Sequence, residues 1–408
     1  GGGGGVRAPR SRAEQPGGER GRGARGPPAP TGPERRRLRS LARACTGGGG
    51  GGGAMSGGGA GAGRHPLSGG GAFRGPGGDA AVRRTNDDAA GARAGCAARG
   101  YLEDPFVGRF VRGRPAPRPP AMNRGSWART QAVRQVLQSF LARAHGGAAG
   151  EGSGESQVVV LGAGFDTSFF NLRLPPGSRW FEVDMEEVVR RKAAVLQRSP
   201  DMLAMMGGPG GEGGADIDLE RGTVRGSAYG LAVADLRDLA GLESALQNLG
   251  VRREPPTLVL LECVLAYLPP EAGQELCRWA AAAFPAGAIV IYEMTGMDEF
   301  GRQLLANLRA RGCALPGFEG CPDLLAQRER LASSGFESVT AWDMDRVYHH
   351  FLEPEERRRV ERLEFLDDPE ELQLIMRHYC FAVGERRAAG GGLGEGLLGG
   401  GGGGAAVG

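Results

Sequence analysis

The chain lacks an apolar run long enough to cross a membrane. Its best run, Thr257 to Leu268, falls short of the roughly 20 residues that a transmembrane helix needs and carries Glu262 in its middle. Neither the first residue nor Met55 is followed by the apolar region and cleavage site of a secretory signal. We therefore expect a cytoplasmic protein with no membrane partner.

Metal-ligand patterns are missing too. The 7 cysteines show no CxxC spacing, and the 5 histidines, with His349 and His350 adjacent and His378 distant, do not have the spacing of zinc ligands. Scattered cysteines are typical of a reducing compartment, where thiols stay unpaired. We interpret the nearest pair, Cys313 and Cys321, as structural, and we expect no metal.

Aromatic and β-branched residues are scarce at both ends. Residues 1–80 and 388–408 are tracts of Gly, Ala, Pro and Arg in a chain that has 75 glycines. Such tracts bury too little apolar surface to offset the entropy of ordering. We expect two disordered tails around one folded domain at residues 81–387.

The first tail holds the excess positive charge. Residues 1–54 contain 11 Arg and 3 Glu, a charge of +8, which leaves −5 for the remainder of a chain whose net charge is +3. A basic tail can bind nucleic acid or membranes nonspecifically. Arg mixed with Gly, Ala and Pro ahead of Met55 also fits translation of GC-rich sequence upstream of a start codon, which we favour, so we expect no specific nucleic-acid partner.

What the chain does have is a glycine turn after an apolar run. In VVVLGAGFDT, residues 158–167, a short β-branched segment is followed by Gly162, Ala163 and Gly164. This is typical of a parallel strand that leads into a nucleotide-binding turn, although the dinucleotide fingerprint needs a third glycine where this chain has Thr167. The turn predicts a ligand site at the carboxyl edge of the sheet, or only a tight turn.

An acid follows the next expected strand. Asp184 ends the segment Trp180 to Val183, twenty residues beyond Gly164, where an acid accepts hydrogen bonds from ribose hydroxyl groups. Asp184 could instead be the N-cap of a helix that begins at Met185.

Strand patterns alternate with helical patterns along the rest of the chain. This predicts an α/β fold with a mostly parallel, seven-stranded sheet and helices on both faces. A helix is expected at Ser126–Ala144, and the Gly- and acid-rich residues 198–226 are interpreted as an insertion loop. The expected strands are Gln157–Leu161, Trp180–Val183, Leu231–Ala234, Leu258–Leu261, Ala288–Tyr292, Ser338–Trp342 and Tyr379–Val383.

Polar residues follow two further strands at the edge where ligands bind in open sheets. Asp235 follows the third strand, and Glu262 follows the fourth with Tyr267 five residues later. A carboxylate in an apolar run such as that of Glu262 needs a positive partner, either a ligand or an arginine in a structural salt bridge. Arg93, Arg124 and Arg129, upstream of the first strand, are the candidate cations.

Seven sequence blocks together resemble the leucine carboxyl methyltransferases, in order and with similar spacing. The resemblance covers about residues 83–384 and implies a Rossmann-like, S-adenosylmethionine-dependent fold with added N-terminal helices and a lid from the insertion and the C-terminal part. The blocks are NRGSWART, VVLGAGFDTSFF, WFEVD, ADLRDL, LECVLAYLPPE, GFESVTAWDM and LDDPEELQLIMRHYC.

The resemblance implies an activity and a partner. That family transfers a methyl group from S-adenosylmethionine to the α-carboxyl group of the C-terminal leucine of type 2A protein phosphatase catalytic subunits, which biases the assembly of regulatory subunits. We expect a monomer that recognises the phosphatase tail together with the active-site face of the folded phosphatase. The missing third glycine then has a reason, because this cofactor has no pyrophosphate.

The resemblance also implies roles for single residues. Gly162 would admit the methionine portion of the cofactor, Asp184 would hold the ribose, and Asp235 with Leu236 would contact the adenine. Glu262 would bind the α-ammonium group, whereas Arg129 and Arg93 would bind the α-carboxylate, although the family's residue at position 93 resembles lysine. Tyr267 would lie beside the sulfonium and the incoming carboxylate, and we expect Tyr267 and Arg129 to serve catalysis.

Three other functions fit parts of the sequence. A Rossmann dehydrogenase would share the turn and the acid but needs the third glycine. A nucleic-acid methyltransferase, or the family's tRNA-modifying sibling, needs a basic surface or a long C-terminal repeat domain, and a Gly tract follows Val383. A phosphatase chaperone without activity is the alternative that is not an enzyme.

Overall fold

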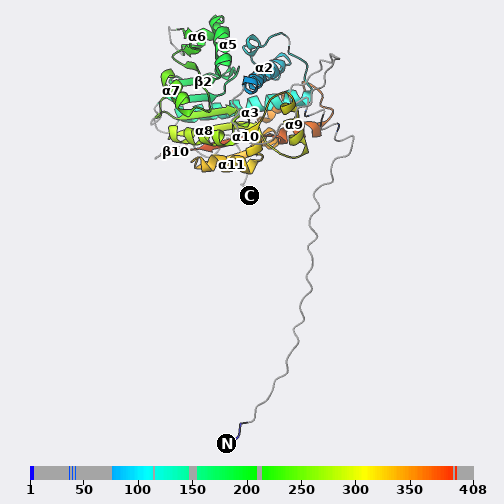
Figure 1. Cartoon of the computed structure of the whole chain (residues 1–408). Coiled ribbons are helices and arrows are strands. Elements are labelled where there is room, and N and C mark those ends of the chain that lie inside the picture. The colour runs from blue at the N-terminus through cyan, green and yellow to red at the C-terminus, as the bar shows by residue number, and fades with distance from the viewer. Residues whose placement is uncertain are drawn as a thin grey trace, which may run out of the picture.

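The computed structural model of this chain describes residues 1–3, 36, 39, 42, 76–113, 115–146, 154–208, 214–388 and 391–392. A central sheet carries helices on both sides (Figure 1). In chain order the elements are α2 (Pro76–Ala98), η1 (Val107–Phe110), α3 (Pro120–His145), β1 (Ser156–Leu161), α4 (Ser168–Asn171), β2 (Ser178–Asp184), α5 (Glu186–Gln197), α6 (Pro200–Met206), β3 (Asp216–Asp218), β4 (Thr223–Arg225), β5 (Tyr229–Val233), α7 (Leu239–Leu249), β6 (Thr257–Glu262), η2 (Leu265–Tyr267), α8 (Pro270–Ala283), β7 (Gly287–Met294), α9 (Glu299–Ala310), α10 (Pro316–Gly320), α11 (Leu324–Ser333), β8 (Ser338–Asp343), α12 (Met344–His350), α13 (Pro354–Glu361), α14 (Pro369–Arg377), β9 (Tyr379–Glu385), β10 (Arg387–Ala388) and β11 (Gly391–Gly392).

The main sheet has the strand order β3-β4-β5-β2-β1-β6-β7-β9-β8. The pairs from β5 to β7 are all parallel, whereas β9 is antiparallel to both β7 and β8. The seven predicted strands are confirmed, and the carboxyl ends of β5, β2, β1, β6 and β7 meet at one edge. This edge is where an open parallel sheet binds its ligand.

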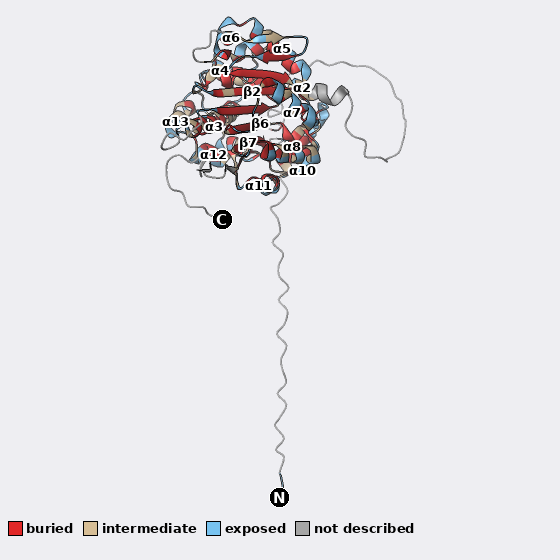
Figure 2. Ribbon diagram, turned by 90° about the vertical axis from the view of Figure 1, so that its left-hand side faces the viewer, coloured by how far each residue is buried: buried red, intermediate tan, exposed pale blue. Residues whose placement is uncertain are grey.

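Each central strand is buried on both faces, as Figure 2 shows for β2, β6 and β7. In β1, Val158 and Val160 belong to an apolar cluster with α3, α5, α9 and α14, and Val159 and Leu161 belong to a second cluster with α7, α8 and α11. Alternate side chains of a strand point to opposite faces, so the continuous apolar run predicted from the sequence fills two cores.

The expectation of an insertion loop at residues 198–226 is wrong for the described part of that segment. It forms α6 and the antiparallel pair β3–β4, and β4 pairs with β5, so the sheet has nine strands. Val224 explains the addition, because its fully buried side chain anchors a strand only three residues long. The Gly and acid content concealed this short apolar signal.

The helix that was predicted before β1 is longer than expected. α3 begins at Pro120, which occupies a position that suits proline in the first helical turn, and it continues through the expected Ser126–Ala144 to His145. α2 begins at Pro76, inside the predicted first tail, and β10 and β11 continue beyond residue 387. Most of both predicted tails lies outside the described residues, where their disorder stays a prediction.

Within the described residues, no helix combines the length and the apolarity that crossing a membrane requires. The six described cysteines are free thiols, and five of them, including Cys313 and Cys321, are buried.

Candidate active site

The glycine turn after β1 is built so closely that side chains are excluded. Gly162 and Gly164 have φ angles of +70° and +51°. A Cβ atom at Gly162 would lie 2.7 Å from Val264 Cγ2, and one at Gly164 would lie 2.7 Å from Asn86 Oδ1. The turn therefore requires glycine for its backbone angles and for its close contact with the chain that follows β6.

A cavity of about 270 Å³ opens beside this turn. It lies at the carboxyl ends of β1, β6 and β7, between α2, α3, α9 and α14. Its walls include five of the predicted site residues, which come from four different segments: Arg93, Arg129, Gly162, Glu262 and Tyr267. Asp184, Asp235 and Leu236 are not among the residues that line it.

Arg129 and Glu262 form an ion pair in the cavity wall. Arg129 Nε donates to Glu262 Oε2 at 2.7 Å, and the guanidinium group lies 4.8 Å from the centre of the Tyr292 ring. Burial lowers the pKa of Arg129, but Glu262, Cys263 and Tyr292 together raise it well above its usual value. The structural salt bridge considered for Glu262 is thus present, with side chains that stay 28% and 16% exposed toward the cavity.

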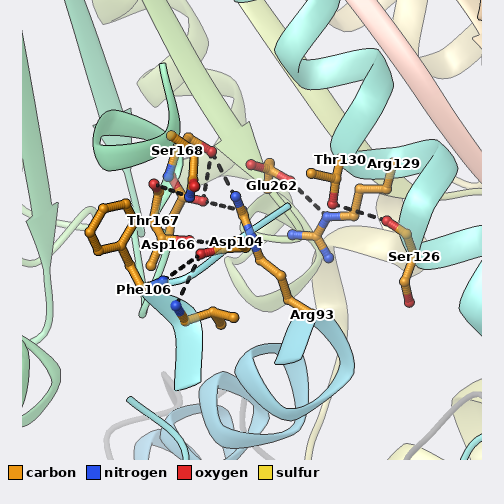
Figure 3. A network of polar contacts seen from close by, with 12 residues as sticks. Arg93, Asp104, Phe106, Ser126, Arg129, Thr130, Asp166, Thr167, Ser168 and Glu262 are labelled. Carbon is orange, nitrogen blue, oxygen red and sulfur yellow. Dashed lines mark hydrogen bonds and ion pairs between the residues drawn. The ribbon is translucent and has the colours of Figure 1, made fainter. Parts of the chain in front are cut away.

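Arg93 is the centre of a second polar group (Figure 3). Its Nε and Nη1 atoms donate to Asp104 and Asp166, each at 2.6 Å, and Thr167 Oγ1 donates to Asp104 at 2.6 Å. Arg93 therefore joins α2 to the segment before η1 and to the glycine turn. Burial lowers its pKa, and the two carboxylates raise it above the usual value.

Asp184 lies behind the glycine turn. It is 5% exposed, and its two oxygens accept the N–H groups of Gly164 at 2.6 Å and of Met185 at 2.7 Å. Burial raises the pKa of Asp184 above its usual value, and these two bonds offset only part of this rise. α5 begins at Glu186 with Met185 as its N-cap, so the alternative that Asp184 caps this helix is wrong.

Asp235 and Leu236 follow β5, two strands away from the turn. The Asp235 carboxylate is 49% exposed and pairs with Arg237 at 2.8 Å, and Arg237 lowers its pKa. Leu236 is 9% exposed. Both residues stand at the ligand-binding edge of the sheet, as predicted, but outside the cavity wall.

Another part of the cavity wall is apolar, and Tyr267 also lines the cavity. Burial raises the pKa of the Tyr267 hydroxyl group above its usual value, with a smaller contribution from Cys263. The apolar wall was not predicted from the sequence. It is made of Met122, Met294, Leu304, Leu308, Met344, Ile375 and Met376. α9 contributes Leu304 and Leu308 to it, so the apolar face of α9 is part of the wall.

Charged residues of α2 attach this helix to α5 and to the segment after α9. Asp87 pairs with Arg191 of α5 at 2.6 Å, and Asp88 pairs with Arg311, after α9, at 2.8 Å. These contacts and those of Asp104 and Asp166 also escaped the sequence analysis. Of these acids, only Asp166 stands in a recognisable motif, because it follows Gly164 in the glycine turn. The motif does not show which residue Asp166 contacts.

A fully buried ion pair contacts the backbone that follows the glycine turn. Lys192 of α5 pairs with Glu182 of β2, and both side chains are 0% exposed. Lys192 Nζ also donates to Asp166 O at 2.8 Å, whereas Glu182 accepts from Tyr229 Oη at 2.7 Å and Trp180 Nε1 at 3.0 Å. Both side chains are inaccessible to a ligand and neither lines the cavity, so we interpret this pair as structural.

Known proteins resemble this chain. Residues 81–281 match the family model described as leucine carboxyl methyltransferase. The Arabidopsis thaliana leucine carboxyl methyltransferase 1 homolog is 36% identical over 315 residues, 76% of this chain and 91% of that protein. Leucine carboxyl methyltransferase 1 of Bos taurus is 37% identical, over 74% of this chain and 89% of that protein.

A relative with another name is as similar. The Homo sapiens tRNA wybutosine-synthesizing protein 4 is 39% identical over 75% of this chain, which spans 44% of that protein. Among solved structures, human N-acetylserotonin methyltransferase in complex with SAM resembles this chain with 13% identity and a TM-score of 0.34, over 65% of this chain and 56% of that one.

Proposed function

We propose, because this chain belongs to the leucine carboxyl methyltransferase family of S-adenosylmethionine-dependent enzymes, that it methylates the α-carboxyl group of a C-terminal leucine on the catalytic subunit of type 2A protein phosphatase. The observation that carries the proposal is a single cavity lined by the Arg129–Glu262 pair, by Tyr267 and by apolar side chains.

The polar half of the cavity fits the amino-acid end of S-adenosylmethionine. That end carries one ammonium and one carboxylate group, and Glu262 and Arg129 present the complementary charges. Gly162 and Gly164 line the same cavity, so the backbone of the glycine turn forms part of its wall next to this pair. We propose that Glu262 holds the ammonium group, Arg129 with Arg93 holds the carboxylate, Asp184 holds the ribose, and Asp235 with Leu236 contacts the adenine.

The chemistry asks for alignment more than for proton transfer. The bound cofactor supplies a methyl group already activated on a sulfonium. A substrate carboxylate is ionised at pH 7, so one of its oxygens bonds to the methyl carbon while the carbon–sulfur bond breaks, its electron pair stays on sulfur, and no proton moves. The described residues contain no group of three or more His, Cys, Asp or Glu side chains placed to hold a metal ion.

The chain's own residues would supply position and a dry site. Holding the reacting groups in line contributes on the order of 7–11 kcal/mol through proximity. Tyr267 would place the carboxylate, and the apolar wall would take the leucine side chain and exclude water, which favours a reaction in which opposite charges neutralise each other.

The decisive experiment measures methyl transfer from labelled S-adenosylmethionine to the purified phosphatase catalytic subunit. A subunit without its terminal leucine is the matched control, and we expect label only on the complete subunit. Equal labelling of both would contradict the proposal. The terminal peptide is the second comparison, because a few residues bury too little surface for strong binding, and we expect the folded subunit to react far faster.

A second function has support of its own. The similarity to the human tRNA wybutosine-synthesizing protein suggests a tRNA substrate, and a carboxylate on a modified base would suit the same chemistry. We therefore include tRNA from cells that lack this wybutosine-synthesizing protein in the same assay. Label on the tRNA and none on the phosphatase would favour this second function. We place the enzyme in the cytoplasm under either proposal, because its described thiols are free.

A further inference from the structure

Glu293 is a buried acid that the proposed function leaves unused. It lies in β7 between Tyr292 and Met294, which both line the cavity, so strand alternation turns Glu293 away from the cavity. It is 2% exposed, no described cation forms an ion pair with it within 4.0 Å, and the charges of Arg330 and Arg129 act on it from a longer distance. Burying a carboxylate without a close counter-ion is costly unless hydrogen bonds compensate it. The partners of these hydrogen bonds therefore indicate what Glu293 does.

One of these bonds holds the segment that carries Tyr267. Glu293 Oε2 accepts the Ala266 N–H at 2.9 Å, and Oε1 accepts the Met294 N–H at 3.1 Å. Ala266 belongs to η2, the single turn that ends in Tyr267. Burial raises the pKa of Glu293 above its usual value, and the two backbone bonds offset only part of this rise.

The same segment is held at its start by the neighbouring residue of β7. Cys263 has a φ of +56°, which is unfavourable for a residue with a side chain, and its N–H donates to Tyr292 O at 2.7 Å. Val264 then packs against Gly162. Consecutive residues of β7 therefore bind the beginning and the end of the turn between β6 and Tyr267.

We infer that Glu293 is a positioning residue, which fixes residues 263–267 so that Tyr267 faces the cavity beside the glycine turn. The inference rests on the proposed function for its effect on catalysis. Glu262 does not depend on Glu293, because it is the last residue of β6 and is paired in register with Tyr292. Loss of the Glu293 contact should therefore disturb the placement of Tyr267 and leave cofactor binding in place.

Two substitutions separate position from charge. Glu293→Gln keeps the length of the side chain and an acceptor oxygen for Ala266, whereas Glu293→Asp keeps the charge and withdraws the carboxylate by one methylene group. We expect Glu293→Gln to keep kcat within about threefold and Glu293→Asp to lower it about tenfold, because small misplacements of reacting groups are costly. The Kd for S-adenosylhomocysteine should change less than about twofold in both.

The Tyr267→Phe variant tests whether Glu293 affects kcat through Tyr267. If Glu293 acts through Tyr267, Glu293→Asp should lower kcat much less in the Tyr267→Phe protein than in the wild type. Equal losses in the two backgrounds, or a Glu293→Asp protein with wild-type kcat, would overturn the inference. So would a larger loss in Glu293→Gln than in Glu293→Asp, because that order points to charge.

A readout that needs no substrate keeps this inference separate from the proposed function. Hydrogen exchange of a peptide covering residues 264–268 reports on the Ala266 N–H, and we expect faster exchange in Glu293→Asp than in the wild type. A wild-type protein that methylates neither the phosphatase nor tRNA would contradict the proposed function alone. Unchanged exchange in Glu293→Asp would overturn the role of Glu293 alone.

Discussion

Two ion pairs stand near the glycine turn, and their surroundings differ. Lys192–Glu182 is fully buried, and each partner has further hydrogen bonds to protein atoms. Arg129–Glu262 faces a cavity, and its side chains keep 28% and 16% of their surface exposed. An acid at a strand end becomes available to a ligand only where the protein leaves part of its hydrogen-bonding capacity unused.

The largest expected effect comes from breaking the buried pair. Lys192→Met should lower the free energy of unfolding by about 3–5 kcal/mol, because it leaves the Glu182 carboxylate buried without a cation. Denaturation in urea measures the change. The control is Arg190→Met on the same helix, whose pair with Glu186 is 50% and 60% exposed and should matter by less than about 1 kcal/mol. A similar loss of unfolding free energy in Lys192→Met and Arg190→Met would refute the distinction between the buried and the exposed pair.

Breaking the cavity pair should act on the ligand. Arg129→Leu should weaken the binding of S-adenosylhomocysteine by about 1.5–3 kcal/mol, the range for a hydrogen bond to a charged group, with a smaller effect on unfolding. Isothermal titration calorimetry gives the affinity. Arg129→Lys keeps the charge but loses the planar fork, so we expect an intermediate value. Full affinity in Arg129→Leu would remove this residue from the cofactor site.

Substitution of Asp184 tests a carboxylate that already accepts hydrogen bonds from the protein backbone. Asp184→Ala should cost about 1–3 kcal/mol of cofactor affinity if a ribose bond is lost, and it also removes the bond to the Gly164 N–H. Asp184→Asn, which keeps one acceptor oxygen, should retain more of both. Calorimetry with the adenosine moiety alone locates the effect, and equal affinity of wild type and Asp184→Ala would argue against the ribose role.

The smallest effect belongs to an exposed pair. Arg109 and Asp201 join η1 to α6 through two bonds of 2.6 Å, and the hydrogen bond from Arg109 lowers the pKa of Asp201 to about 2. A lowered folded-state pKa means that the stabilisation is present above the unfolded pKa of about 4 and disappears as the pH falls toward 2. The Tm difference between wild type and Asp201→Asn should therefore be small at pH 6 and vanish near pH 2. A difference that grows on acidification would contradict this assignment.

Strand ends could be predicted from the sequence because two local signals coincide there. An apolar run that is interrupted by Gly162, Asp184 or Glu262 marks both the strand and its carboxyl edge. The lining of the cavity could not be predicted, because Leu304, Ile375 and Met376 have the spacing of any amphipathic helix. Their access to the cavity depends on how α9 and α14 pack against the sheet.

Charged pairs show the same limit. Lys192 sits in a helix with several charged neighbours, where a solvent-facing position is the ordinary expectation, and its partner Glu182 is ten residues earlier in β2. Arg93 was identified as a candidate, but Asp104 and Asp166 reach it from two other segments. Pattern and composition hold no information on which of several acids meets a given arginine.

The position of β9 determines when this protein can fold during synthesis. β9 is the last strand of the main sheet along the chain, yet it lies between β7 and β8, so until residue 385 has left the ribosome β7 is unpaired on one side and β8 lacks the strand it pairs with. Exposed strand edges favour association with other chains, so a nascent chain stalled before Tyr379 is the form most prone to aggregate. Ile375, Met376 and Tyr379 also complete the cavity wall. We therefore expect the ability to bind a ligand to arise only after β9 has been synthesised, together with the completed sheet.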